Sequence, residues 1–76
     1  MSSRDQLAHK LVYMANQIGM FFRAQDTETA SAKIAEHISK FWDPRMREAI
    51  LAHLEAGGAR LDPATRGAIE SLRARR

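Results

Sequence analysis

The stretch FWDPRMR, residues 41–47, decides the fold, because it ends one helix and begins the next. Asp43 is placed to accept a hydrogen bond from a free N–H at the start of a helix, as N-cap residues do. Pro44 follows at the first helical position, where its fixed φ suits a helix and its missing N–H costs nothing. The proline ring also disfavours helical backbone at Asp43, so the preceding helix must end at about Trp42. The stretch therefore predicts a corner between two helices.

Apolar residues recur at three- and four-residue steps on both sides of this corner, which is the spacing of amphipathic helices. Asp62 and Pro63 repeat the Asp-Pro helix start, and Gly57 and Gly58 end the helix before it. The sequence has one valine and no run in which apolar and polar residues alternate, so it predicts no strand. We therefore expect an all-α fold, a small single-domain bundle over residues 1–76, with three main helices and a shorter fourth C-terminal helix. The expected ranges are about residues 4–23, 27–42, 44–56 and 63–73, with a frayed basic tail at 74–76.

Large apolar residues are more numerous than a small helical core needs. The first helix carries a main stripe that runs from Leu7 to Phe21 and Phe22, and Tyr13 and Met20 point away from that stripe. Gly19 inside the helix costs about 1 kcal/mol relative to alanine, unless it lets a neighbour approach closely. Phe22 and Phe41 are expected to complete the core. For Tyr13, Met20 and Trp42, burial by another chain is an equal alternative, since aromatics and methionine are enriched at protein interfaces.

The size and charge of the chain also favour a partner. A chain of 76 residues buries only about 60% of the surface that its unfolded form exposes, so its own core is marginal. It has no cysteine, which excludes disulfides and thiolate metal sites. The formal charge is +3, and the excess lies in the last twenty residues, where Arg60, Arg66, Arg73, Arg75 and Arg76 outnumber Asp62 and Glu70. A basic end of this kind suits nucleic acid or an acidic protein surface, and is otherwise a solvated end.

Residue patterns that carry catalysis are missing from the sequence. The three histidines, His9, His37 and His53, lack the spacing and the carboxylate companions of a metal site, so packing or hydrogen bonding is the preferred interpretation. No serine stands in a nucleophile context, and the glycine pair follows a helix, whereas phosphate sites precede one. No apolar run is long enough to span a bilayer, and the opening residues do not resemble a secretory signal. We therefore expect a non-catalytic, cytoplasmic chain that binds no cofactor, no metal and no membrane.

Two blocks of the sequence resemble a known family. Residues 11–22, LVYMANQIGMFF, resemble the MANQIG–FF block of the delta subunit of NAD-dependent formate dehydrogenase. Residues 34–38, IAEHI, followed by FWDPRMR, resemble the IA-HI–FWDPRMR signature of the same family. The resemblance covers most of residues 11–54, and residues 1–10 and 57–76 do not contribute to it.

The resemblance implies a small accessory subunit of a cytoplasmic, molybdenum-containing formate dehydrogenase. In that family the large alpha subunit carries bis-molybdopterin guanine dinucleotide and iron–sulfur clusters, and the beta and gamma subunits pass electrons to FMN and NAD. The delta subunit has no redox centre and supports assembly, stability or cofactor maturation of the alpha subunit. A chain without cysteine agrees with this expectation, because iron–sulfur clusters are held by thiolates.

We therefore expect the chain to dock on the alpha subunit. The two arginines after Pro44 stand where the helix dipole disfavours positive charge, so they are expected to pair with carboxylates, or with phosphates of the guanine dinucleotide during its delivery. One alternative is a transient chaperone that delivers the molybdenum cofactor. A less favoured alternative is a small nucleic-acid-binding regulator that uses the basic end. The residues predicted to contact the partner are Tyr13, Asn16, Gln17, Met20, Trp42, Arg45, Met46 and Arg47.

Overall fold

The structure is a computed structural model that describes residues 3–75, and within them it contains helices and no strand. The all-α prediction is confirmed. The elements follow one another as α1 (Ser3–Met20), α2 (Thr27–Phe41), α3 (Pro44–Glu55) and α4 (Pro63–Ala74). No helix among the described residues has the length and apolar character needed to cross a membrane.

The end of α1 lies three residues before the expected one, and four other helix bounds differ from the expected ranges by one residue. Helix α1 stops at Met20, because the N–H groups of Phe21 and Phe22 donate to Ile18 O and Gly19 O, three residues back, at 3.1 and 3.0 Å. Such bonds tighten the chain into turns and end the regular helix. Helix α4 extends through Ala74, with Arg75 as its C-cap, and Arg76 lies outside the described residues.

The corner between α2 and α3 is formed as the sequence predicts. The side chain of Asp43 accepts a hydrogen bond from Met46 N at 2.9 Å, and Pro44 opens α3. The preceding residue, Trp42, has extended backbone (φ −89°, ψ 137°), while its N–H still donates to Ile38 O. Helix α2 therefore closes its last turn just before the chain reverses.

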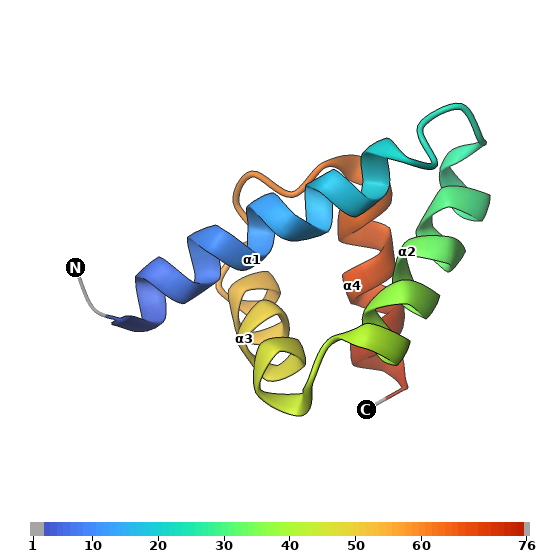
Figure 1. The fold of residues 1–76 in the computed structure, drawn as a ribbon. Coiled ribbons are helices and arrows are strands. Elements are labelled where there is room, and N and C mark those ends of the chain that lie inside the picture. Colours follow the sequence, from blue (N-terminus) through green and yellow to red (C-terminus); the bar gives the residue numbers. More distant parts are fainter. Residues whose placement is uncertain (1–2, 76) are drawn as a thin grey trace.

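Small residues let the helices approach one another closely. Helix α2 packs most extensively against α4, where the Ser31 hydroxyl donates to Ala64 O at 2.6 Å and a Cβ on Gly67 would lie 2.7 Å from Ser31 Oγ. Helix α1 crosses one end of this pair, while the α2–α3 corner and the end of α4 lie at the opposite end (Figure 1). At the crossing a Cβ on Gly19 would lie 2.9 Å from Thr65 Oγ1, which confirms that Gly19 permits a close approach.

The core decides between the alternatives for Trp42 and corrects the expectation for Phe41. Trp42, for which core packing and burial by another chain were equal alternatives, is only 4% exposed and packs in the chain's own core. It lies four residues after Ile38 and so continues the inner face that Ile34 and Ile38 form, because four-residue steps keep side chains on one side of a helix. Phe41, expected in the core, is 70% exposed and stacks on His37 instead, with ring centroids 4.7 Å apart.

The two phenylalanines that follow α1 also separate. Phe22 packs partly buried against the core, as expected, whereas Phe21 is 84% exposed. The sequence placed Phe21 in the main stripe of the first helix, and that expectation is wrong. The tight turns after Met20 rotate the chain away from the helical period, so only one of the two neighbouring rings can reach the core.

Candidate interaction surfaces

An exposed row of large side chains runs along the outer side of α1. We call it the outer stripe, and it consists of Tyr13, Gln17 and Met20 of α1 together with the exposed Phe21 that directly follows the helix. Positions 13, 17 and 20 lie at four- and three-residue steps of one helix, so their side chains share a face. Tyr13 is 66% exposed and Met20 52%, and the Gln17 amide donates to the Tyr13 hydroxyl at 2.6 Å. The outer stripe thus holds three of the predicted contact residues, together with Phe21, which was not predicted.

Asn16, also predicted to contact a partner, binds the chain's own loop. Its side-chain amide donates to Arg60 O at 2.8 Å, and its Oδ1 accepts from Asp62 N at 3.1 Å. Arg60 has a positive φ of 69°, a conformation that residues other than glycine seldom adopt. Asn16 therefore fixes the α3–α4 loop against α1, a role that appears only when the two segments are brought together.

The corner residues have different surroundings from one another. Trp42 is buried in the core, so it offers no exposed surface to a partner in this conformation. Met46 is partly buried and packs against the core, and Arg45 is exposed. Arg47 is partly buried, and its Nη1 donates to Trp42 O at 2.5 Å and to Ser39 O at 3.4 Å. Arg47 thus caps the carbonyl end of α2, where positive charge is favourable.

The predicted contact residues form two groups rather than one patch. The outer stripe belongs to α1, whereas the corner lies at the end of α3 that is remote from α1 (Figure 1). The two groups therefore form separate candidate surfaces.

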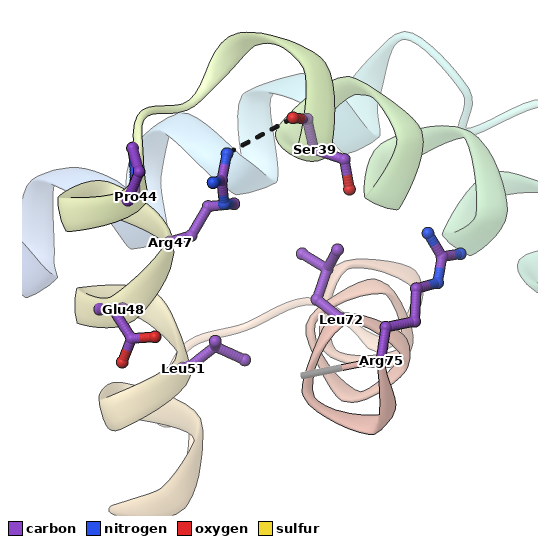
Figure 2. Close-up of a pocket in the computed structure, with 7 residues that line it drawn as sticks. All are labelled: Ser39, Pro44, Arg47, Glu48, Leu51, Leu72 and Arg75. Atoms are coloured by element: carbon purple, nitrogen blue, oxygen red, sulfur yellow. Dashed lines mark hydrogen bonds between the residues drawn. The ribbon is translucent and has the colours of Figure 1, made fainter.

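A pocket of about 370 Å³ opens beside the corner, and we call it the corner pocket. Figure 2 shows Arg47 from α3 and Arg75 from α4 on either side of Leu72, both extending toward α2. Of this set, sequence reasoning predicted only Arg47 as a contact residue, because the lining comes from separate helices with no spacing that links them. The pocket is lined by Ser39, Pro44, Arg47, Glu48, Leu51, Leu72 and Arg75.

Two further polar side chains, those of Arg66 and His53, make hydrogen bonds that stabilise the loop between α3 and α4. The Arg66 guanidinium donates to Gly57 O and Gly58 O at 2.6 and 3.1 Å, so one arginine of the basic end stabilises the loop after α3. A second pocket of about 140 Å³ is lined by His9, Val12, His53, Ala59 and Arg60, and the His53 ring bonds Ala59 O through Nε2 at 2.8 Å. Among residues 3–75, no group of three histidine, aspartate or glutamate side chains is arranged to hold a metal ion.

The titration of Asp26 is also explained by helix capping. Its carboxylate accepts hydrogen bonds from the backbone N–H of Thr29 at 2.9 Å and from the Thr29 hydroxyl at 2.8 Å. These bonds, the backbone one foremost, lower the pKa of Asp26 from its ordinary value of 3.8, because they favour the charged form. The shift therefore belongs to the N-cap of α2 and not to a site of chemistry.

Comparison with protein families agrees with the two sequence blocks. The family model described as NADH-dependent formate dehydrogenase delta subunit, FdsD, matches residues 10–69. The chain belongs to this family. The match contains both blocks, MANQIG and FWDPRMR, so the resemblance drawn from the sequence is confirmed. Searches of the curated proteins and of the solved structures gave no match.

Membership in the FdsD family gives the chain a coarse function. It is the delta subunit of an NAD-dependent formate dehydrogenase, a small subunit of a multisubunit enzyme. The outer stripe, the corner and the corner pocket all lie within the matched residues, except for Leu72 and Arg75 of the pocket, which follow them.

Proposed function

We propose that this FdsD chain is a non-catalytic accessory subunit, which docks through its outer stripe on the large alpha subunit of a cytoplasmic molybdenum formate dehydrogenase. In this proposal the bis-molybdopterin guanine dinucleotide, the iron–sulfur clusters, FMN and NAD are carried by the alpha, beta and gamma subunits. The bound delta subunit supports assembly and stability of the alpha subunit and, through them, maturation of its cofactor.

The observation that carries the proposal is the outer stripe in a chain of this family. Tyr13 and Met20 are more than half exposed along one side of α1, and Phe21, which directly follows Met20, is 84% exposed. Contiguous exposed apolar surface on a small soluble domain marks an interaction site. Aromatic residues and methionine are also those that contribute most to protein interfaces, because they bury much area at little conformational cost.

The proposal is tested by placing charge in the outer stripe. Met20→Asp with Phe21→Asp, co-expressed with the other subunits, is expected to weaken association of the delta chain by about thirtyfold or more, as truncation of an interface hot spot does. Ala52→Asp is the matched control, since Ala52 is exposed on α3 and its substitution also adds a carboxylate to a helix surface. Association is measured as the amount of delta chain that co-purifies with tagged alpha subunit.

Size-exclusion chromatography of the active wild-type enzyme separates a permanent subunit from a transient one. A delta chain that co-elutes in stoichiometric amount supports the accessory role. An active enzyme without it supports the alternative, a chaperone that delivers the molybdenum cofactor and leaves. If the Met20→Asp, Phe21→Asp chain binds as tightly as the Ala52→Asp chain, docking through the outer stripe is wrong.

A further inference from the structure

The corner pocket holds an arginine with unused donors. Arg47 Nη1 donates hydrogen bonds to two backbone carbonyls, those of Trp42 and Ser39. Its Nη2 and Nε make no hydrogen bond within the described residues. A guanidinium has five N–H donors in a fixed plane, so capping α2 leaves one edge of the group available. The two capping bonds also hold that edge in place, which lowers the entropic cost of binding a planar anion.

Arg75 supplies the second positive charge and is almost free of internal bonds. Its side chain makes one long hydrogen bond, from Nη2 to Ser71 Oγ at 3.4 Å, and it reaches over the pocket from the end of α4 (Figure 2). Unlike Arg47, it bonds no backbone carbonyl through its side chain within the described residues. Helix capping therefore explains the position of Arg47 but not that of Arg75.

The rest of the lining decides between kinds of anion. Leu51 and Leu72 give the pocket an apolar side, which suits the aliphatic part of a peptide better than a free phosphate. Glu48 contributes one negative charge, although it already has an interaction partner within the chain. Two guanidinium groups beside one carboxylate leave the lining with one excess positive charge, which a single carboxylate of a ligand would neutralise.

We propose that the corner pocket binds an acidic peptide segment, with an aspartate or glutamate carboxylate held between Arg47 and Arg75 and a neighbouring aliphatic side chain against Leu51 and Leu72. Planar guanidinium groups bind carboxylates through paired N–H donors, which gives such a contact direction as well as strength. Resting on the proposed function, we assign the segment to another subunit of the formate dehydrogenase. The corner pocket is then a second contact, separate from the outer stripe.

The pocket is tested first with the isolated full-length chain. Acetyl-Leu-Asp-Glu-Leu-amide is titrated into the ¹⁵N-labelled protein, and the amide-neutral version with Asn and Gln in place of the acids is the control peptide. We expect the acidic peptide alone to shift backbone amide signals of Ser39, Glu48 and Arg75. Arg75→Glu is expected to abolish these shifts, and Arg73→Glu to leave them, since Arg73 carries the same charge on the same helix but does not line the pocket.

Four outcomes of the titration overturn the proposal. The first is the absence of shifts at millimolar peptide, and the second is an equal response to the neutral peptide. The third is an equal loss of the shifts in Arg75→Glu and Arg73→Glu. The fourth is a response of the same size to sodium acetate or inorganic phosphate alone, which would make the pocket a simple anion site.

The complex provides the second test and separates this proposal from the proposed function. In the co-expressed enzyme we expect Arg75→Glu to weaken retention of the delta chain about tenfold relative to Arg73→Glu, since a guanidinium–carboxylate pair becomes a pair of like charges. If wild-type, Arg73→Glu and Arg75→Glu chains are all retained equally, the pocket contact is wrong while docking stands. If even the wild-type chain is not retained, docking fails, and the peptide titration still decides whether the pocket binds an acidic segment.

Discussion

At the scale of single residues, the side chain of Asn16 stabilises the α3–α4 loop of its own chain. Its two hydrogen bonds join α1 to Arg60 and Asp62, and Arg60 needs such support because of its positive φ. We expect Asn16→Ala to lower the free energy of unfolding by about 1–2 kcal/mol, since both loop groups lose their partner. Gln17→Ala, beside it, is the control and is expected to change stability by less than about 0.5 kcal/mol. Urea denaturation measures both, and equal effects would contradict the loop role of Asn16.

Gly19 leads to a second prediction at this scale. Alanine favours a helix over glycine by about 1 kcal/mol, but its Cβ would lie 2.9 Å from Thr65 Oγ1 and 3.4 Å from Ile34 Cδ1. Overpacking of this kind costs about 1–3 kcal/mol, so Gly19→Ala is expected to destabilise the chain by a net amount of about 1 kcal/mol.

Thr65 provides the partner for a double-mutant cycle with Gly19. Its Oγ1 is buried and has no hydrogen-bond partner among the described residues, so removing it costs little polar interaction. In the double variant Gly19→Ala, Thr65→Ala the clash is absent, and we expect a favourable coupling of about 0.5 kcal/mol or more from thermal or urea unfolding. Strict additivity of the two substitutions would show that Gly19 and Thr65 are too far apart at the crossing of α1 and α4 for the added methyl group to clash.

At the scale of elements, the two Asp-Pro helix starts differ in strength. Asp43 accepts a hydrogen bond from Met46 N, whereas the Asp62 side chain makes no capping bond to α4. Asp43→Ala is therefore expected to lower the free energy of unfolding by about 1 kcal/mol, and Asp62→Ala by clearly less. The pair is compared by urea denaturation in the same buffer. A larger loss for Asp62→Ala would mean that the dipole of α4, and not the hydrogen bond, decides the strength of the start.

The N-cap of α2 makes stability depend on pH. The pKa of Asp26 lies below its ordinary value of 3.8 in the folded chain, so the unfolded chain binds more protons in this window. The stabilisation is complete above 3.8 and is lost as the pH falls through the folded pKa. Asp26→Asn keeps a capping oxygen but does not titrate, so its stability is expected to fall less steeply below pH 3.8 than that of the wild type. Parallel slopes for the two proteins would contradict this assignment.

The helices and the corner were predictable from sequence because their signals are local. Asp43 and Pro44 act on backbone groups within one turn, so their effect does not depend on the rest of the fold. Which of the two side chains, Trp42 or Phe41, is buried depends instead on where α2 ends. Each further residue of a helix changes the side-chain direction by about 100°. The roles of Asn16 and Arg47 were equally out of reach, because their partners are backbone carbonyls whose position follows from the packing of separate elements.

At the scale of the whole molecule, two different surfaces occupy opposite ends of a small bundle. The outer stripe is mainly apolar and lies on α1, whereas the corner pocket combines charged residues with two leucines and is lined by residues of α2, α3 and the end of α4 (Figure 2). The core between them is built from the inner faces of all four helices, and two of its residues, Leu51 and Leu72, also line the corner pocket. The two proposals together give the chain one contact with an apolar surface and a second contact with an acidic segment.

This arrangement predicts that the two contacts contribute independently to assembly. Met20 is the last residue of α1 and Arg75 is the C-cap of α4, and these two helix ends lie at opposite ends of the bundle (Figure 1). The free energies of substitutions at separated sites add within about 0.5 kcal/mol. The loss of affinity in the double variant Met20→Asp, Arg75→Glu is therefore expected to equal the product of the two single losses. The affinity of the purified delta chain for the enzyme lacking it, measured by titration at fixed salt, checks this. A double variant that binds no worse than the weaker single variant would show that one contact forms only after the other, and that the chain does not bridge two independent surfaces.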